Sequence, residues 1–243
     1  MEIMLGEYGF CQGVQRAIDI ALKASQKNAP APVYTNTGLI HNNTVISYLE
    51  NHNIFALGKE QKLNTLDTLI ISAHGTDENY ITKFLKQGVH VINAVCPFVN
   101  KIHEKVKEFC KKENTCIIII GDRNHEEVKG ISQACKCFQV INSASEIDFT
   151  QAEEFLVVVQ TTFSNSLYGE IKQNINDLAN ILLKRVEFFN SICYTTLCRQ
   201  NECETIAKQS DTVLVIGDKN SSNCSKLYNI AASNCTDVRL VQN

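Results

Sequence analysis

Tryptophan and long apolar stretches are missing from this sequence, and their absence excludes several classes of protein. The longest uninterrupted apolar runs, 116–120 and 155–159, have only the length of a strand. A membrane span needs about 18 apolar residues, so no membrane partner is expected. Positive charge is not in excess either, because the 243 residues carry a net charge of −3, which argues against a nucleic-acid partner. We therefore expect the partner to be a small molecule.

Linkers and sorting signals are also scarce. Only three prolines occur, and no Gly/Ser-rich or charged block separates one part of the chain from another, so any domains must pack closely. The first residues do not combine a positively charged segment with an apolar one, which is the pattern of a secretory signal. We therefore expect a cytoplasmic protein.

Cysteine, in contrast, is abundant. Eleven cysteines are an odd number and a large share for a reducing compartment, where thiols serve metals or catalysis more often than disulfides. Three of them recur in similar contexts: Cys11 in GFCQGVQRAI, Cys96 in AVCPFVNKIH and Cys193 in SICYTTLCRQ. Their spacings of 85 and 97 residues predict three similar α/β units around a pseudo-three-fold axis. Such an axis would bring the three thiols together.

The expected fold class is α/β with parallel sheets. Short β-branched runs recur along the chain, and each is followed by a segment with helical periodicity, which favours buried parallel strands joined by right-handed crossovers. After Gly13, for example, Val14, Ala17 and Ile18 share one face of an amphipathic helix. The expected strands are 2–5, 68–72, 90–95, 115–121, 155–160, 186–190 and 212–217.

We expect three units: 12–95, 96–192, and a third made of 1–11 plus 193–243. The segment that begins at Cys193 holds 51 residues, fewer than the 85 and 97 residues that separate the repeated cysteines. The third unit is therefore expected to be incomplete, and the chain to be truncated at its C-terminus.

Parallel sheets bind ligands beyond the carboxyl ends of their strands, where the following helices present free N–H groups. A cysteine at a helix N-terminus favours the thiolate, which is the form that binds metals. Three convergent thiolates without a fourth suit an iron–sulfur cluster with one open iron, or a Cys₃ zinc site. The chemically capable residues that follow the expected strands are Cys11, His74, Cys96, His125, Thr161, Cys193 and Ser221.

The other cysteines are expected to have no such role. Cys198 and Cys203 follow Cys193 at five-residue intervals, which advance about 500° along a helix and scatter the thiols over different faces. Cys224, in the polar turn KNSSNC, is expected to approach the ligand without binding metal. The cysteines expected to be small buried hydrophobes are Cys110, Cys116, Cys135, Cys137 and Cys235.

Three histidines at turns suggest a site for a diphosphate. They are His41 in LIHNNTV, His74 in SAHGT and His125 in DRNHEEVKG, and the hydroxyls and N–H groups of KNSSN would complete the site. Glu127 is either an ordinary carboxylate of a first helical turn or a proton carrier beside bound phosphate. The remaining histidines, expected to be exposed or packed, are His52, His90 and His103.

Eight segments resemble, in order and spacing, the motifs of the 4-hydroxy-3-methylbut-2-enyl diphosphate reductase family of the non-mevalonate isoprenoid pathway. They are GFCQGVQRAI, IHNNTVI, SAHGT, VCPFVNKIH, NHEEVKGI, QTTFS, ICYTTLCRQ and GDKNSSN. The resemblance implies three α/β units around one [4Fe–4S] cluster per chain, with Cys11, Cys96 and Cys193 as its ligands. It implies proton transfer by Glu127 and assistance by Thr161 at the substrate hydroxyl. The diphosphate-binding residues that it implies are His41, His74, His125, Thr161, Ser221, Ser222 and Asn223.

The implied reaction is reductive dehydroxylation of an allylic diphosphate to isopentenyl and dimethylallyl diphosphates. It consumes two electrons and two protons, and the resemblance implies ferredoxin or flavodoxin as the electron donor. Two features depart from the family. Glu126 stands where the family usually has proline, and the family's last phosphate-binding serine would fall in the missing C-terminal stretch.

Two alternatives from other classes stay open. A relic or sensor would keep the cluster and lose turnover, but it would have no need of the diphosphate-binding histidines. A cysteine hydrolase would use Cys11 or Cys96 with a histidine, and it would leave the three-fold repeat unexplained.

Overall fold

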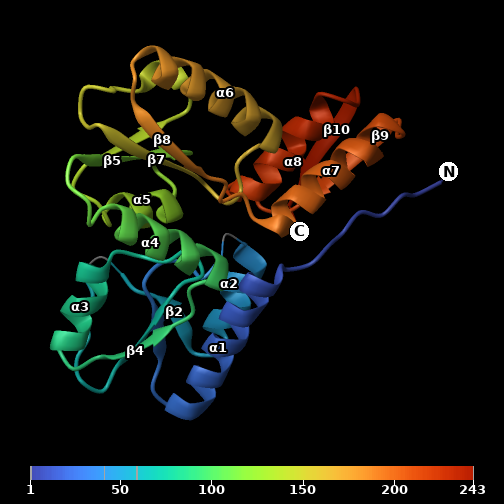
Figure 1. Cartoon of the computed structure of the whole chain (residues 1–243). Coiled ribbons are helices and arrows are strands. Elements are labelled where there is room, and N and C mark those ends of the chain that lie inside the picture. The colour runs from blue at the N-terminus through green and yellow to red at the C-terminus, as the bar shows by residue number, and fades with distance from the viewer. Residues whose placement is uncertain (1, 41, 59, 243) are drawn as a thin grey trace. The chain divides into compact units, whose positions relative to one another are not determined.

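The structure, a computed structural model, describes residues 2–40, 42–58 and 60–242 (Figure 1). The chain forms two compact units. We call Phe10–Glu113 with Arg123–Phe138 the α1–α5 unit, and Met1–Gly9 with Asn114–Asp122 and Gln139–Asn243 the α6–α8 unit. Among the described residues, no helix has both the length and the apolar composition to cross a membrane.

The α1–α5 unit is built on a four-stranded sheet with the strand order β2-β1-β3-β4. Every strand pair in it is parallel. The strands are β1 (Val33–Thr35), β2 (Ile54–Ala56), β3 (Thr68–Ile71) and β4 (His90–Asn93). The helices are α1 (Gln12–Asn28), α2 (Asn43–Glu50), α3 (Glu78–Lys86), α4 (Pro97–Phe109) and α5 (Glu126–Ser132).

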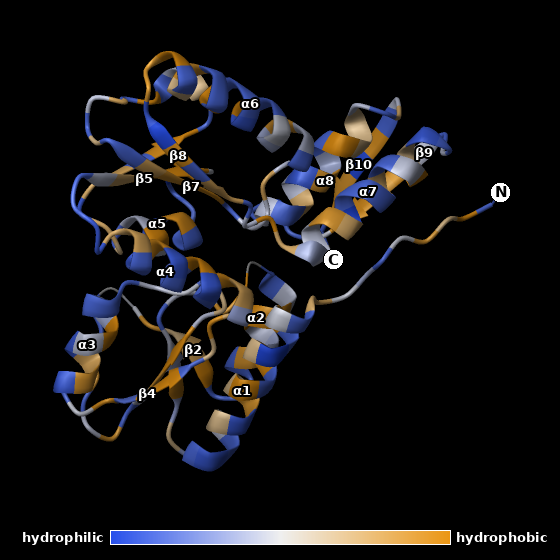
Figure 2. Cartoon of the chain, viewed as in Figure 1, coloured by the Kyte–Doolittle hydropathy of each residue, from blue (hydrophilic) through white to orange (hydrophobic). Residues whose placement is uncertain are grey.

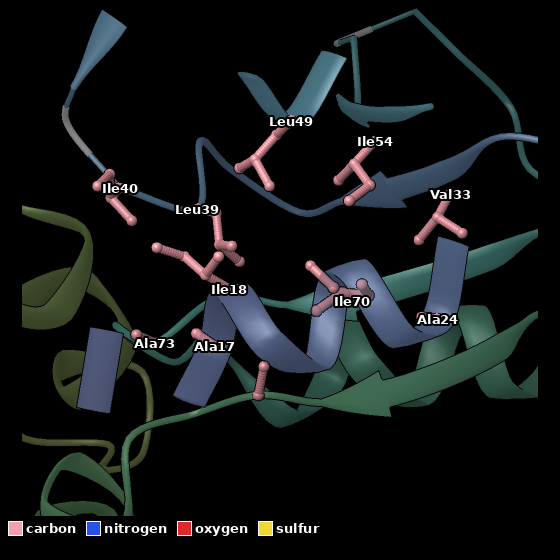
Figure 3. Packing of buried hydrophobic residues seen from close by; sticks show 12 residues of the cluster. Ala17, Ile18, Ala24, Val33, Leu39, Ile40, Leu49, Ile54, Ile70 and Ala73 are labelled. Atoms are coloured by element: carbon pink, nitrogen blue, oxygen red, sulfur yellow. The ribbon is translucent and has the colours of Figure 1, made fainter. Parts of the chain in front are cut away.

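One face of α1 packs on this sheet and forms the core of the unit (Figure 3). Ala17 and Ile18 of the helix are buried in one cluster with Val33 of β1 and Ile70 of β3. The opposite face of the helix is hydrophilic, as the colours of α1 in Figure 2 show. The amphipathic periodicity after Gly13 therefore predicts this packing correctly, because the hydrophobic effect buries the apolar face.

The α6–α8 unit contains a four-stranded sheet with the order β6-β5-β7-β8 and a two-stranded sheet of β10 and β9. Side chains of β5 and β7 are almost wholly buried, as expected for central strands of a parallel sheet with both faces covered. Its strands are β5 (Thr115–Ile120), β6 (Phe138–Ile141), β7 (Glu154–Val159), β8 (Arg185–Phe189), β9 (Thr212–Ile216) and β10 (Asp237–Val241). Its helical segments are η1 (Ala144–Glu146), α6 (Asn165–Ile181), α7 (Tyr194–Lys208) and α8 (Ser222–Ala232).

The predicted α/β class with parallel sheets is confirmed, and six of the expected strands lie within two residues of their predicted ends. Residues 2–5 were expected to form a strand, and this is wrong, because they adopt neither helix nor strand. Ile3 and Leu5 in this segment are largely exposed. The assignment to three units around a pseudo-three-fold axis stays a prediction.

Disulfide bonding corrects the expectation for four cysteines, Cys110, Cys116, Cys135 and Cys137. Cys110 at the end of α4 and Cys135 after α5 are joined, with their Cα atoms 5.7 Å apart. That separation lies within the range that a disulfide can bridge. We expected these residues to be isolated thiols, because the sequence does not reveal that α4 and α5 pack together.

Candidate functional site

Helix N-termini carry most of the predicted site residues. Cys11, Cys96 and Cys193 are the N-cap residues of α1, α4 and α7. His125 and Ser221 hold the same position at α5 and α8. Because the unpaired N–H groups of the first helical turn carry partial positive charge, each of these side chains lies where a thiolate or a phosphate is favoured.

Two of the three predicted metal ligands converge in the α1–α5 unit. A Cβ atom placed on Gly13 would lie 2.6 Å from Cys96 Sγ and 3.9 Å from Cys11 Sγ. Gly13 therefore leaves open the space beside both sulfur atoms. Arg16 of α1 donates a hydrogen bond to the Val95 carbonyl at 3.1 Å and so ties this helix to the residue before Cys96.

This arrangement fits a thiolate-bound metal group. The two sulfurs lie at the positive ends of two helices, and the position between them has no side chain. Cys193 belongs to the α6–α8 unit, and the described residues contain no group of three or more His, Cys, Asp or Glu side chains arranged to hold a metal. The convergence of all three thiols therefore stays a prediction.

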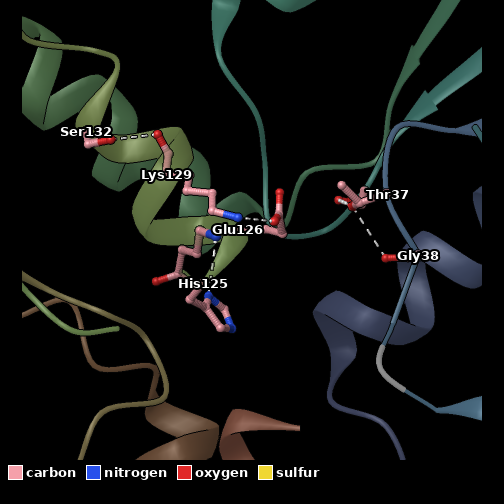
Figure 4. A network of polar contacts seen from close by, with 8 residues as sticks. Thr37, Gly38, His125, Glu126, Lys129 and Ser132 are labelled. Atoms are coloured by element: carbon pink, nitrogen blue, oxygen red, sulfur yellow. Dashed lines mark hydrogen bonds and ion pairs between the residues drawn. The ribbon is translucent and has the colours of Figure 1, made fainter. Parts of the chain in front are cut away.

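Two of the predicted phosphate-binding histidines lie side by side in the same unit. The rings of His74 and His125 make an edge-to-face contact, with centroids 5.6 Å apart and planes at 84°. His125 Nδ1 accepts a hydrogen bond from the backbone N–H of Glu127 at 3.3 Å (Figure 4). Because Nδ1 accepts, a neutral His125 carries its proton on Nε2, which is then a donor.

The two carboxylates at the start of α5 have different environments. Glu127 is only 1% exposed, so it is not an ordinary solvated carboxylate of a first helical turn. Glu126, which stands where the family usually has proline, forms an ion pair with Lys129 at 2.8 Å (Figure 4). The additional carboxylate of this chain is therefore neutralised within its own helix.

His41 lies outside the described residues, but the turn before it is anchored to the strand end before His74. The backbone N–H of Ser72 donates to Asn36 Oδ1 at 2.7 Å, and the Thr37 hydroxyl donates to Ser72 Oγ at 3.2 Å. These bonds tie the two loops that carry His41 and His74 to each other near their strand ends.

The α6–α8 unit carries the predicted hydroxyl and amide groups. Ser221 Oγ caps α8 by accepting from the backbone N–H of Cys224 at 3.4 Å, and Thr161 is buried two residues after the end of β7. Ser222 Oγ lies 2.8 Å from Thr162 Oγ1 and accepts a hydrogen bond from Gln160 Nε2 at 3.1 Å. Asn223 follows in the first turn of α8.

Gln160 and Thr162 contact the predicted site residue Ser222, and the sequence analysis did not single them out. They orient Ser222 from the end of β7, although both lie in the QTTFS motif. Their position at the end of the expected strand 155–160 and two residues after it was the available signal. Cys224 also has a clear place, because its sulfur packs against Gly217, where a Cβ atom would lie 2.3 Å from it.

Comparisons with known proteins agree on one family. The family described as "LytB protein" matches residues 3–243. A 4-hydroxy-3-methylbut-2-enyl diphosphate reductase of Clostridium perfringens strain 13 is 39% identical over 244 residues, with 99% of this chain and 84% of that protein covered. The protein of the same name from Thermoanaerobacter sp. strain X514 is 38% identical and covers 98% of this chain and 83% of its own length.

Two solved structures are similar in fold and sequence. One, titled as the (E)-4-hydroxy-3-methyl-but-2-enyl diphosphate reductase and terminal enzyme of the non-mevalonate pathway, has a TM-score of 0.72 and 30% identity, covering 97% of this chain and 83% of that chain. The other, an E-1-hydroxy-2-methyl-but-2-enyl-4-diphosphate reductase from Plasmodium falciparum, has a TM-score of 0.86 and 30% identity, covering 96% of this chain and 73% of that chain.

Proposed function

This chain belongs to the LytB protein family, and from that membership we propose that it is a 4-hydroxy-3-methylbut-2-enyl diphosphate reductase. The substrate is an allylic alcohol that carries a diphosphate. Its C–O bond breaks, two electrons and two protons are taken up, and the products are water with isopentenyl or dimethylallyl diphosphate. The family match over residues 3–243 carries the proposal, and the approach of the Cys11 and Cys96 thiols to the open face of Gly13 agrees with it.

Cys11, Cys96 and Cys193 are the residues that would hold a [4Fe–4S] cluster, one per chain. When bound, this cluster supplies the reducing electrons. The protein's contribution is to hold thiolates at helix N-termini, where the partial positive charge of the unpaired N–H groups lowers the energy of the anionic sulfur.

The diphosphate is proposed to bind through ring N–H groups, hydroxyls and helix N-termini. His74 and His125 offer ring N–H groups, and His41 is assigned with them. The hydroxyls of Ser221 and Ser222, together with Asn223, add donors at the start of α8. Helix N-termini favour anions because their unpaired N–H groups point outward. Binding the diphosphate through several groups orients the distant allylic end of the substrate.

Glu127 is proposed to deliver the proton that allows the hydroxyl to leave as water. A buried carboxyl group beside a bound anion retains its proton more readily than an exposed one, which suits a general acid. Thr161 is proposed to hydrogen-bond the substrate hydroxyl and to hold its oxygen for protonation. Ferredoxin or flavodoxin is the proposed source of the electrons.

Anaerobic purification followed by iron and sulfide analysis tests this function directly. The reductase should contain four irons and four sulfides per chain, as the proposed cluster requires, and should release isopentenyl and dimethylallyl diphosphates from the substrate when a chemical reductant is supplied. Protein that holds the cluster but does not turn over the substrate would be a cluster-binding relic. Protein without iron would contradict the proposed function altogether.

A further inference from the structure

His103 is a buried histidine that the proposed chemistry does not use. It belongs to α4, seven residues after Cys96, so the two side chains lie on nearly the same face of the helix, two turns apart. Only 9% of His103 is exposed. The helix that begins at a proposed metal ligand therefore also carries an imidazole into the interior of the α1–α5 unit.

The ring of His103 lies against two glycines from two other parts of the site. A Cβ atom on Gly75, which follows His74, would lie 3.1 Å from His103 Nε2, and Gly75 has a φ of +79°. A Cβ atom on Gly130 of α5 would lie 3.4 Å from His103 Cε1 and 3.6 Å from the Thr76 backbone. A side chain at Gly75 would crowd the ring, and a Cβ atom at Gly130 would be in ordinary van der Waals contact with it, so the imidazole lies directly against both glycines.

These contacts connect three elements that carry proposed site residues. The 74–76 turn carries His74, α5 begins at His125 and holds Glu127, and α4 begins at Cys96. Gly130 lies three residues after Glu127, close to one helical turn, so the packing of this glycine bears on the position of the carboxyl group. His103 is the common neighbour of the turn and α5.

Packing, rather than a hydrogen bond at Nε2, holds the ring of His103 in place. Within the described part of the chain, His103 Nε2 forms no hydrogen bond. A buried polar atom without a partner is unfavourable, and an apolar side chain would avoid that penalty. Burial, followed by the charge of Lys107, lowers the pKa of His103, while Glu78 acts in the opposite direction. The ring is therefore neutral at physiological pH.

We propose that His103 is a positioning residue for diphosphate binding, a role that rests on the proposed function above. Its neutral ring is wedged between Gly75 and Gly130, and it holds the His74 turn and the start of α5 at a fixed distance from each other and from Cys96. The ring acts through the placement of His74 and His125, which are the groups proposed to contact the phosphates.

Binding of inorganic diphosphate, measured by calorimetry on the anaerobic 243-residue protein, tests this role without requiring turnover. His103→Ala should weaken binding about tenfold or more, because the two loops lose their common spacer. His103→Phe restores a ring of similar size and should return the affinity to within about threefold of the original. His90→Ala, which removes an exposed histidine of the same unit, should leave binding unchanged.

The iron content of each variant separates the possible outcomes. His103→Ala should retain its cluster while losing diphosphate affinity, which a general loss of structure would not produce. Equal affinity of His103→Ala and the original protein would overturn the inference. If His103→Ala does not fold, Gly130→Val takes its place, because it pushes on the ring from α5 and valine is no worse a helix former than glycine. Unchanged affinity in that variant would equally overturn the inference.

Failure of the proposed function would look different. Original protein that binds diphosphate but does not convert the substrate would contradict the reductase activity and leave the His103 result valid. Original protein that does not bind diphosphate at all would contradict both.

Discussion

Gly13 leaves space beside the sulfur atoms of Cys11 and Cys96 because it has no side chain. It lies in the first turn of α1, where alanine would be the better helix former. Alanine at this position would place a methyl group 2.6 Å from Cys96 Sγ, closer than atoms in contact can approach. Glycine at this position is therefore explained by the space that the two thiols need rather than by the local backbone.

We expect Gly13→Ala to lower the affinity for the cluster about 10- to 100-fold, as changes beside metal ligands commonly do. Iron and sulfide content, together with visible absorption of the anaerobic protein, would measure the loss. Gly169→Ala is the matched control, because Gly169 lies in α6 and a Cβ atom there would meet nothing within 4 Å. If both alanine variants retain iron equally, Gly13 has no special role beside the thiols.

A variant of Glu127 can separate the effect on substrate binding from the effect on the chemical step. Glu127→Gln keeps the size of the side chain and removes the transferable proton, so turnover should fall by about 100-fold or more. The affinity for inorganic diphosphate should change little. Glu126→Gln serves as the control, because that carboxylate already pairs with Lys129. Near-normal turnover of Glu127→Gln would assign the proton to another group.

His103 also makes a prediction about pH. Its pKa in the folded protein is lowered from the ordinary value of 6.5, so the unfolded chain takes up a proton at a higher pH than the folded one. The contribution of His103 to stability is therefore complete above about pH 6.5 and is lost as the pH falls through and below that value. Urea unfolding between about pH 5 and 7.5 should show a smaller loss of stability at low pH for His103→Phe than for the original protein.

The comparison of His103→Phe with the original protein could also give the opposite result. Lys107, Glu78, His74 and Glu127 remain in both proteins, so the difference between the two curves isolates the ring of His103. Parallel pH dependences would mean that His103 takes up its proton in the folded protein as readily as in the unfolded chain.

At the scale of elements, α4 and α5 form the framework of the candidate site. Their N-termini carry Cys96 and His125, and the disulfide between Cys110 and Cys135 joins the end of α4 to the segment after α5. The interior contact of His103 with Gly130 lies between those two ends. The pair of helices is therefore held both by a covalent bond and by packing.

Removing this disulfide should destabilise the fold more than it affects the site residues. The two cysteines are 25 residues apart, and a loop of that size predicts a loss of about 3 kcal/mol when the bond is broken. Urea unfolding of Cys110→Ser against the unreduced original protein would measure it, with Cys198→Ser, which removes a free thiol, as the control. Detection of two free thiols at Cys110 and Cys135 in the isolated protein would contradict this pairing.

At the scale of the whole molecule, the proposed ligands are divided between the two units. Cys11 and Cys96 belong to the α1–α5 unit and Cys193 to the α6–α8 unit, and the same division separates the histidines from Ser221, Ser222 and Asn223. The proposed function therefore draws on groups from both units.

Replacement of Cys193 tests this division of the ligands. Cys193→Ser should lose the cluster as completely as Cys96→Ser, although the two residues lie in different units, because a cluster held by two thiolates is expected to be labile. Cys235→Ser, a free cysteine of the α6–α8 unit, should retain its iron. Cluster retention in Cys193→Ser with loss in Cys96→Ser would restrict the metal site to the α1–α5 unit.

Local sequence was sufficient to predict the alternation of strands and helices and the chemical character of the helix N-termini. Runs such as 116–120 and 155–159 form buried parallel strands because their residues are apolar and mostly β-branched. The three repeated cysteines are N-caps, and for two of them the local signal is plain: an amphipathic helix follows Cys11, and a helix with proline in its first turn follows Cys96. These features depend on periodicity and on residues close together in the chain.

Tertiary structure decided what local patterns do not contain. Strands β1 and β2 have three residues each, too few for a periodic signal, and they exist because β3 pairs with β1 and β1 pairs with β2. Residues 2–5 show the opposite case: their strand-like pattern does not become a strand, because β pairing needs a partner as well as propensity.

The same distinction applies within the candidate site. The types and order of the proposed site residues come from the sequence. The sequence does not show three other features: the burial of Glu127, the hydrogen bond from Gln160 to Ser222, and the packing of His103 between two glycines. The Gln160–Ser222 bond and the packing of His103 join segments that are distant in the chain. The burial of Glu127 results from other segments that shield its carboxyl group from solvent. The sequence determined which chemical groups are present at the helix ends, and only the tertiary structure decided which of them meet, because meeting depends on packing between elements.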